Sequence, residues 1–90
     1  MNFDAVKPPV NLIADFQALQ LTIADDRSGD KARQMVDYLK TSELKCQEIG
    51  LHSTDFEEKQ FARMLSEAFD AAGRIVLSAW RKANDSDLLV

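Results

Sequence analysis

The most restrictive feature of this sequence is a stretch of about thirty residues, from Thr54 to Ala83, with no proline and a single glycine. Apolar residues recur along it at spacings of four and three, which places them on one stripe of an α-helix. The stripe consists of Phe61, Leu65, Ala68, Ala72, Ile75 and Ala79. The pattern predicts one helix over about residues 55–83, roughly 43 Å long.

The two ends and the middle of this stretch carry further signals. Thr54 and Glu57 form the Thr-x-x-Glu pattern of a capping box, in which each side chain satisfies a backbone N–H of the other residue. Asn84 and Asp85 are the first helix-breaking residues after it. Gly73 lies inside the predicted helix, where glycine costs about 1 kcal/mol relative to alanine. We therefore expect another helix to approach closely at Gly73.

A second helix is predicted over about residues 30–49. Its apolar stripe has an unbroken 3-4-3-4-3 spacing, which is the heptad spacing of helices that pack along one seam, as in a coiled coil. The stripe consists of Ala32, Met35, Leu39, Ser42, Cys46 and Ile49. Asp30 is the expected N-cap, and Gly50 is the expected residue after the C-terminus. Because only residues 51–53 separate the two helices, they should form an antiparallel hairpin.

A shorter helix is predicted over about residues 12–25, with Asn11 as its cap. Its stripe consists of Leu12, Phe16, Leu19 and Ile23. Pro8-Pro9 disfavours helix before it, so residues 1–10 should be an irregular lead-in, and residues 84–90 should fray. The fold class is therefore all-α: a hairpin with an additional N-terminal helix, three-helix bundle-like, in one small domain over residues 1–90.

Composition excludes several classes of protein. Apolar residues make up 46% of the 90 residues, enough for a packed core, so a disordered chain is not expected. Eleven basic against fifteen acidic residues give a net charge of −4, which disfavours a nucleic-acid-binding protein. No apolar run exceeds three residues, and the first ten residues lack the pattern of a signal peptide. We expect a cytoplasmic protein without membrane insertion.

The residues that could carry chemistry do not form a recognisable catalytic or metal-binding pattern. His52, the only histidine, falls in the predicted hairpin turn, and Cys46, the only cysteine, falls on an apolar stripe. Asp25, Asp26 and Asp30 lack the spacing of a calcium loop, because Val36 stands where its bidentate glutamate belongs. The sequence predicts a protein that is not an enzyme and has no cofactor or metal site.

The unequal lengths of the two predicted hairpin helices suggest a surface. The shorter helix ends opposite about residue 74, so residues 75–83 extend beyond it. The candidate partner-binding residues near and within this extension are Phe69, Ala72, Ile75, Val76, Ala79 and Trp80. Two interpretations remain open: these residues form an exposed apolar patch that binds a partner or a second copy, or the N-terminal helix covers them.

Two segments carry a family resemblance. The first is Gly50-Leu51-His52-Ser53-Thr54-Asp55-Phe56-Glu57, which joins two amphipathic helices; the second runs from Glu67 to Val76 and is completed by the ending Asn84 to Val90. Together they resemble the YscE/SsaE-type E-component of type III secretion systems, over about residues 44–90. The resemblance implies a cytoplasmic co-chaperone that pairs with a tetratricopeptide-like chaperone and keeps the needle subunit unpolymerised. The first 28 residues are longer than that family implies.

The sequence therefore predicts a small helical adaptor or co-chaperone that binds a partner protein through an apolar helix face. One alternative is a self-associating protein, either a homodimer or a needle or filament subunit. Another is a small phage or host regulator that acts by sequestering a protein.

Overall fold

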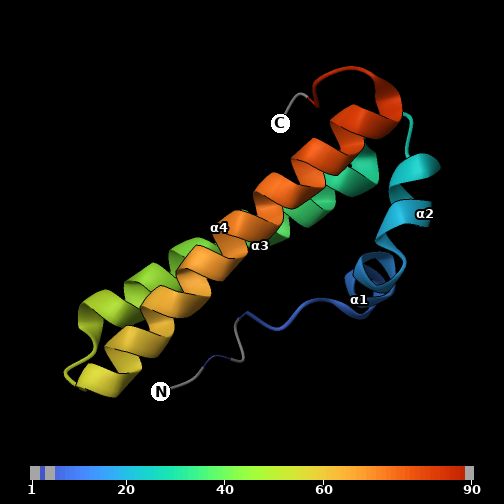
Figure 1. Cartoon of the computed structure of the whole chain (residues 1–90). Helices are drawn as coiled ribbons and strands as arrows, with labels where there is room; N and C mark the ends of the chain where they lie inside the picture. The colour runs from blue at the N-terminus through green and yellow to red at the C-terminus, as the bar shows by residue number, and fades with distance from the viewer. Residues whose placement is uncertain (1–2, 4–5, 89–90) are drawn as a thin grey trace.

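The computed structural model describes residue 3 and residues 6–88, and these form four α-helices without a β-strand. The helices are α1 (Val10–Gln17), α2 (Leu19–Ala24), α3 (Asp30–His52) and α4 (Phe56–Asn84). Figure 1 shows α3 and α4 side by side and antiparallel, with α2 beside the end of the hairpin farthest from its connecting loop and α1 next to α2. The all-α fold and the hairpin are confirmed.

The seam of α3 follows the predicted stripe closely. Five of the six predicted residues are buried, and Ile49 is half-buried. Glu43 is buried beside them, and its carboxylate Oε1 accepts a hydrogen bond from Nζ of Lys40 at 3.1 Å. Heptad spacing therefore predicted the packed face of this helix, although Leu44 and Leu51 of α3 are exposed outside this face.

The packed face of α4 is shifted from the predicted stripe by one position along the sequence. The buried residues are Ala62, Ser66, Val76 and Trp80, with Phe69 and Gly73 half-buried between them. This set has the same 4-3-4-3-4 spacing as the predicted one, but the two are rotated by about 100° on the helix. The predicted stripe is therefore not the buried face of α4, since Ala68 and Ile75 are exposed. Both sets have the period of a helix, so spacing alone did not distinguish them.

The close approach between the hairpin helices lies at Gly50, not at Gly73. A Cβ atom added at Gly50 would lie 3.5 Å from the Cβ of Ala62, whereas one added at Gly73 would meet nothing within 4 Å. Gly50 was predicted to follow the end of its helix, but α3 continues to His52. The N–H of Ser53 then donates to the carbonyl of Ile49 at 3.0 Å. The small residues at Gly50 and Ala62 therefore let the backbones approach near the connecting loop.

The caps at three helix starts also differ from the predicted ones. Asp55, not Thr54, is the N-cap of α4, and its Oδ1 accepts from the N–H of Glu57 at 2.9 Å. Gly29 rather than Asp30 precedes α3, with a φ of 83° that favours glycine. Pro9 rather than Asn11 precedes α1. Of these three residues only Asp55 makes a side-chain hydrogen bond to the first turn; Pro9 and Gly29 make none.

The N-terminal region is two short helices instead of one. The chain bends at Ala18, which has φ −115° and ψ 44°. The hydroxyl of Thr22 then donates to the carbonyl of Asp15 at 3.2 Å, which joins α2 to α1 across the bend. Leu12 of α1 and Ile23 of α2 are both buried in the same core, as the predicted stripe required.

The two ends of the chain lie against the hairpin where they are described. Val6 is buried, and its carbonyl accepts a hydrogen bond from the hydroxyl of Tyr38. The ring of Phe3 packs edge-on against Phe61, with centroids 5.1 Å apart. At the other end, Leu88 packs beside Gly29 and against the core. The remaining residues of the predicted lead-in and frayed tail, 1–2, 4–5 and 89–90, lie outside the described residues.

Candidate functional site

Trp80 joins three parts of the chain at the end of the bundle. Its indole Nε1 donates a hydrogen bond to the carbonyl of Asp26 at 2.7 Å, in the loop between α2 and α3. The Asp26 carboxylate in turn accepts from the N–H groups of Lys31 and Ala32, at 3.2 and 2.9 Å, and so satisfies the start of α3. Asp26 is buried, and these backbone contacts account for its burial without a metal ion.

This arrangement covers much of the part of α4 that extends past α3. Val76 and Trp80 are 2% and 6% exposed, and they share a core with Leu12 and Ile23. The N-terminal helices therefore cover Val76 and Trp80, as in the second of the two interpretations. An exposed patch that includes Val76 and Trp80 is wrong for this structure.

The structure brings five of the six predicted partner-binding residues to one core. Phe69, Ala72 and Ala79 are half-buried and pack against the cluster that holds Val76 and Trp80. Ile75 alone among the six is exposed, at 59%. Contact of any of these residues with another protein stays a prediction.

A different apolar surface lies along the outer side of α4. We call it the outer row, and it consists of Phe61, Met64, Ala68, Ala71 and Ile75. All five residues are exposed; Met64 is 57% exposed, Ile75 is 59% exposed, and Phe61, against which the ring of Phe3 packs, is 41% exposed. Their spacing is 3-4-3-4, so they follow one side of the helix. The predicted stripe contained three of them, Phe61, Ala68 and Ile75, and Ile75 was also a candidate partner-binding residue.

The outer row was missed as a surface because α4 is apolar on two sides. In the sequence, the outer row forms a second apolar set with heptad spacing beside the buried set. Periodicity cannot decide which of two such sets is buried. The presence of Trp80 on the other set was the available signal, since tryptophan contributes the largest apolar area.

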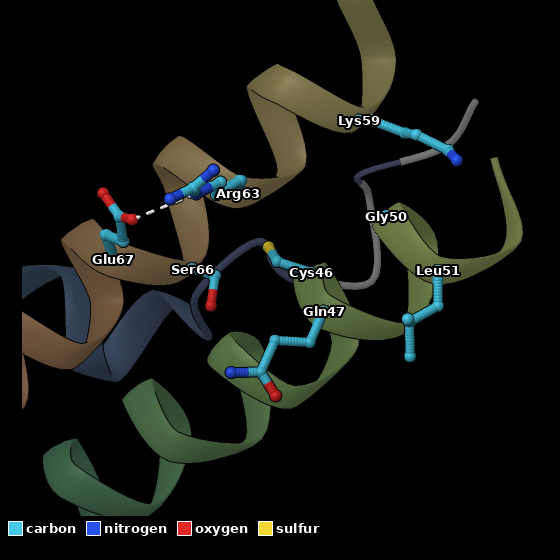
Figure 2. A pocket seen from close by; sticks show the side chains of 8 residues that line it. All are labelled: Cys46, Gln47, Gly50, Leu51, Lys59, Arg63, Ser66 and Glu67. Atoms are coloured by element: carbon cyan, nitrogen blue, oxygen red, sulfur yellow. Dashed lines mark hydrogen bonds and ion pairs between the residues drawn. The ribbon is translucent and has the colours of Figure 1, made fainter. Parts of the chain in front are cut away.

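A hollow lies between α3 and α4 near their connecting loop. It encloses about 530 Å³ and is lined by Cys46, Gln47, Gly50, Leu51, Lys59, Arg63, Ser66 and Glu67. Figure 2 shows α3 and α4 contributing its two walls, with Arg63 directed toward Glu67. The Arg63 Nε and Glu67 Oε1 atoms are 3.4 Å apart, so the two charges compensate each other at the rim.

Cys46 at the base of this hollow is poorly suited to nucleophilic chemistry. The residue is buried, and burial raises the pKa of its thiol above the ordinary value because the thiolate loses hydration. A reactive cysteine needs the opposite environment, one that lowers the pKa. Cys46 therefore acts as a small apolar residue in the seam of α3.

The other residues considered for chemistry are dispersed. His52 is exposed and is the last residue of α3, not part of the connecting loop in which it was predicted to lie. Across the described residues, no group of three or more histidine, cysteine, aspartate or glutamate side chains could hold a metal ion. None of the helices in the described part of the chain combines the length and apolar character needed to cross a membrane.

Comparison with known proteins gives one result. The chain matches no curated protein and no solved structure. A family model described as "Type III secretion system regulatory protein HrpD6" matches residues 3–82, which include all four helices but the last two residues of α4. The expected link to type III secretion is thereby confirmed, whereas the match does not support the YscE/SsaE type in particular. This chain belongs to the HrpD6 family of type III secretion system regulatory proteins.

Proposed function

We propose that this protein is a non-enzymatic regulator of type III secretion that acts by binding another protein of the secretion system through the outer row of α4. The observation that carries the proposal is the exposure of five apolar residues on one side of one helix. Burial of such a surface is favourable by about 25 cal/mol for each Å² removed from water, and a continuous apolar helix face is a common recognition element.

Two further features support binding rather than catalysis. The buried polar group Asp26 is fully occupied with stabilising the fold, and the buried thiol of Cys46 has a raised pKa. The outer row is also carried by the longest helix, which is held along its length by α3 and at its end by Trp80. A rigid helix loses little conformational freedom on binding, so most of the energy of apolar burial is retained.

The more specific form of the proposal follows from the sequence resemblance. In that form the protein is a cytoplasmic co-chaperone that joins a tetratricopeptide-like chaperone and a needle subunit before export. The general form requires only one partner from the secretion system.

The test is co-purification of the tagged protein from cells that carry the matching secretion gene cluster, with partners identified by mass spectrometry. Ala71→Glu places a charge in the middle of the outer row. Thr41→Glu, at an exposed position of α3, adds the same charge elsewhere and is the matched control. We expect a secretion protein to be captured by the unmodified chain and by Thr41→Glu, and to be lost with Ala71→Glu.

Retention of the same partner by Ala71→Glu would contradict the assignment of the outer row. Circular dichroism of both variants checks that the helices are intact. For the specific form, the chain is mixed with the chaperone and needle subunit of the same cluster. A ternary complex supports the co-chaperone role, and failure to form one removes that role.

A further inference from the structure

We propose that, in the isolated protein, the outer row is occupied by a second copy of this chain, with the two α4 helices packed antiparallel. The inference rests on the proposed function, because it concerns the same docking surface. It deepens that function by naming the occupant that a partner protein must displace.

The first argument is the continuation of the row at both of its ends. Glu57 lies four residues before Phe61, and Ser78 and Lys82 lie three and seven residues after Ile75. All three added positions are exposed. The extended row thus keeps the alternating three-and-four spacing of a coiled-coil seam over about 38 Å of helix, with apolar residues from Phe61 to Ile75 and polar residues at its two ends.

The second argument is that the row matches itself when it is reversed. A two-fold axis midway between Ala68 and Ala71 places each residue opposite the one equally far on the other side. Met64 then faces Ile75 of the second copy, and Ala68 faces Ala71 of the second copy. The large side chains of Met64 and Ile75 thus meet each other, Phe61 faces the smaller Ser78, and the alanines at the axis let the two helices approach closely.

The third argument is charge complementarity. The same axis brings Glu57 opposite Lys82 of the second copy, and symmetry repeats this pair at the other end. A parallel pair of helices would instead place like charges opposite each other, Glu57 against Glu57 and Lys82 against Lys82. The charges therefore favour the antiparallel arrangement and oppose the parallel one.

Residues beside the row agree with this arrangement. Glu67 and Arg74 flank it on one side and come within reach of each other between copies. Each is already paired within its own helix, Glu67 with Arg63 at 3.4 Å and Arg74 with Asp70 at 2.6 Å. These exposed pairs contribute little to stability, so exchanging them for contacts between copies costs little.

The first test measures the oligomeric state of the full chain by sedimentation velocity over a range of concentrations. We expect a reversible dimer. Glu57→Lys or Lys82→Glu alone should raise the dissociation constant by roughly tenfold, since attraction becomes repulsion at both ends of the seam. The double variant Glu57→Lys with Lys82→Glu should return it to within about threefold of the original, because the pairs are restored with reversed signs.

The second test establishes the direction of the helices. Met64→Cys and Ile75→Cys proteins are oxidised separately and as a mixture. The antiparallel dimer predicts a disulfide chiefly in the mixture, because only then are two thiols opposite each other. A parallel dimer predicts that each variant links to itself. The unmodified chain, whose Cys46 is buried, is the control and should remain unlinked.

A monomer at every concentration up to about 1 mM would overturn the inference. So would self-linking of each cysteine variant, or a double charge variant no tighter than the single ones. These outcomes are separable from the partner test. A monomer that loses its secretion partner with Ala71→Glu leaves the proposed function intact, whereas a dimer whose Ala71→Glu variant retains the partner contradicts that function and not the dimer.

Discussion

Replacing Trp80 with alanine should strongly destabilise the fold of this protein instead of only weakening a surface. The side chain is 6% exposed and packs in the core cluster with Leu12 and Ile23. Removing a buried tryptophan of this kind costs about 3–5 kcal/mol. A chain of this length has a total free energy of unfolding of about 5–13 kcal/mol. The variant should therefore lose about a quarter or more of its free energy of unfolding.

The hydrogen bond of Trp80 can be separated from its apolar contribution. Trp80→Phe keeps most of the ring area but leaves the carbonyl of Asp26 without the indole donor that lies at 2.7 Å. A buried polar group left unsatisfied costs about 1–3 kcal/mol. We therefore expect Trp80→Phe to be less stable than the unmodified chain, and Trp80→Ala to be the least stable of the three.

The measurement is urea unfolding followed by circular dichroism, which does not depend on tryptophan fluorescence. Leu44→Ala is the matched control, because Leu44 is 53% exposed on α3 and lies outside both the core cluster and the outer row. Its cost should stay below about 1 kcal/mol. If Trp80→Ala were no more destabilising than Leu44→Ala, the packing described at this end of the bundle would be refuted.

Three other changes test the structure at separate places. Gly73→Ala should stabilise the protein by up to about 1 kcal/mol, measured by thermal unfolding, because an added Cβ meets nothing within 4 Å; a loss of stability would show that a helix does approach there. Asp26→Ala should cost about 2 kcal/mol in urea unfolding, since two N–H groups at the start of α3 lose their acceptor, and an unchanged midpoint would argue against this cap. Cys46 should react with a thiol reagent only after denaturant is added, and fast labelling of the folded chain would contradict its burial. Because burial raises the pKa of the folded thiol, the unfolded chain loses its thiol proton first as the pH rises; the free energy of unfolding should fall above the ordinary cysteine pKa, and a Cys46→Ala variant should lack that fall.

The hairpin was predictable because each of its helices has a strong local signal. The face of α3 that packs was also correctly predicted, since Met35, Leu39 and Cys46 have no competing apolar set on that helix. The interruption over residues 25–30 separated the N-terminal region from α3 in both the prediction and the structure. These features depend on residues close together in the chain.

The buried side of α4 was not predictable in this way. Phe61, Ala68 and Ile75 on one side, and Ala62, Phe69 and Val76 on the next, repeat with the same period. The choice between the two sets depends on where α3 and the N-terminal helices lie. Burying Trp80 decides it, because its ring fills the core and its N–H reaches a carbonyl 54 residues away in the chain.

The sequence by itself determined that this chain forms long antiparallel helices with few polar groups suited to chemistry, because helix period, capping residues and charge are local properties. Only the tertiary structure decided which apolar side of α4 is buried and which is left on the surface. The physical reason is that burial is a property of a residue and its neighbours in space. The outer row, and with it the surface for which a partner or a second copy is proposed, follows from the positions of Trp80, Asp26 and the bend at Ala18.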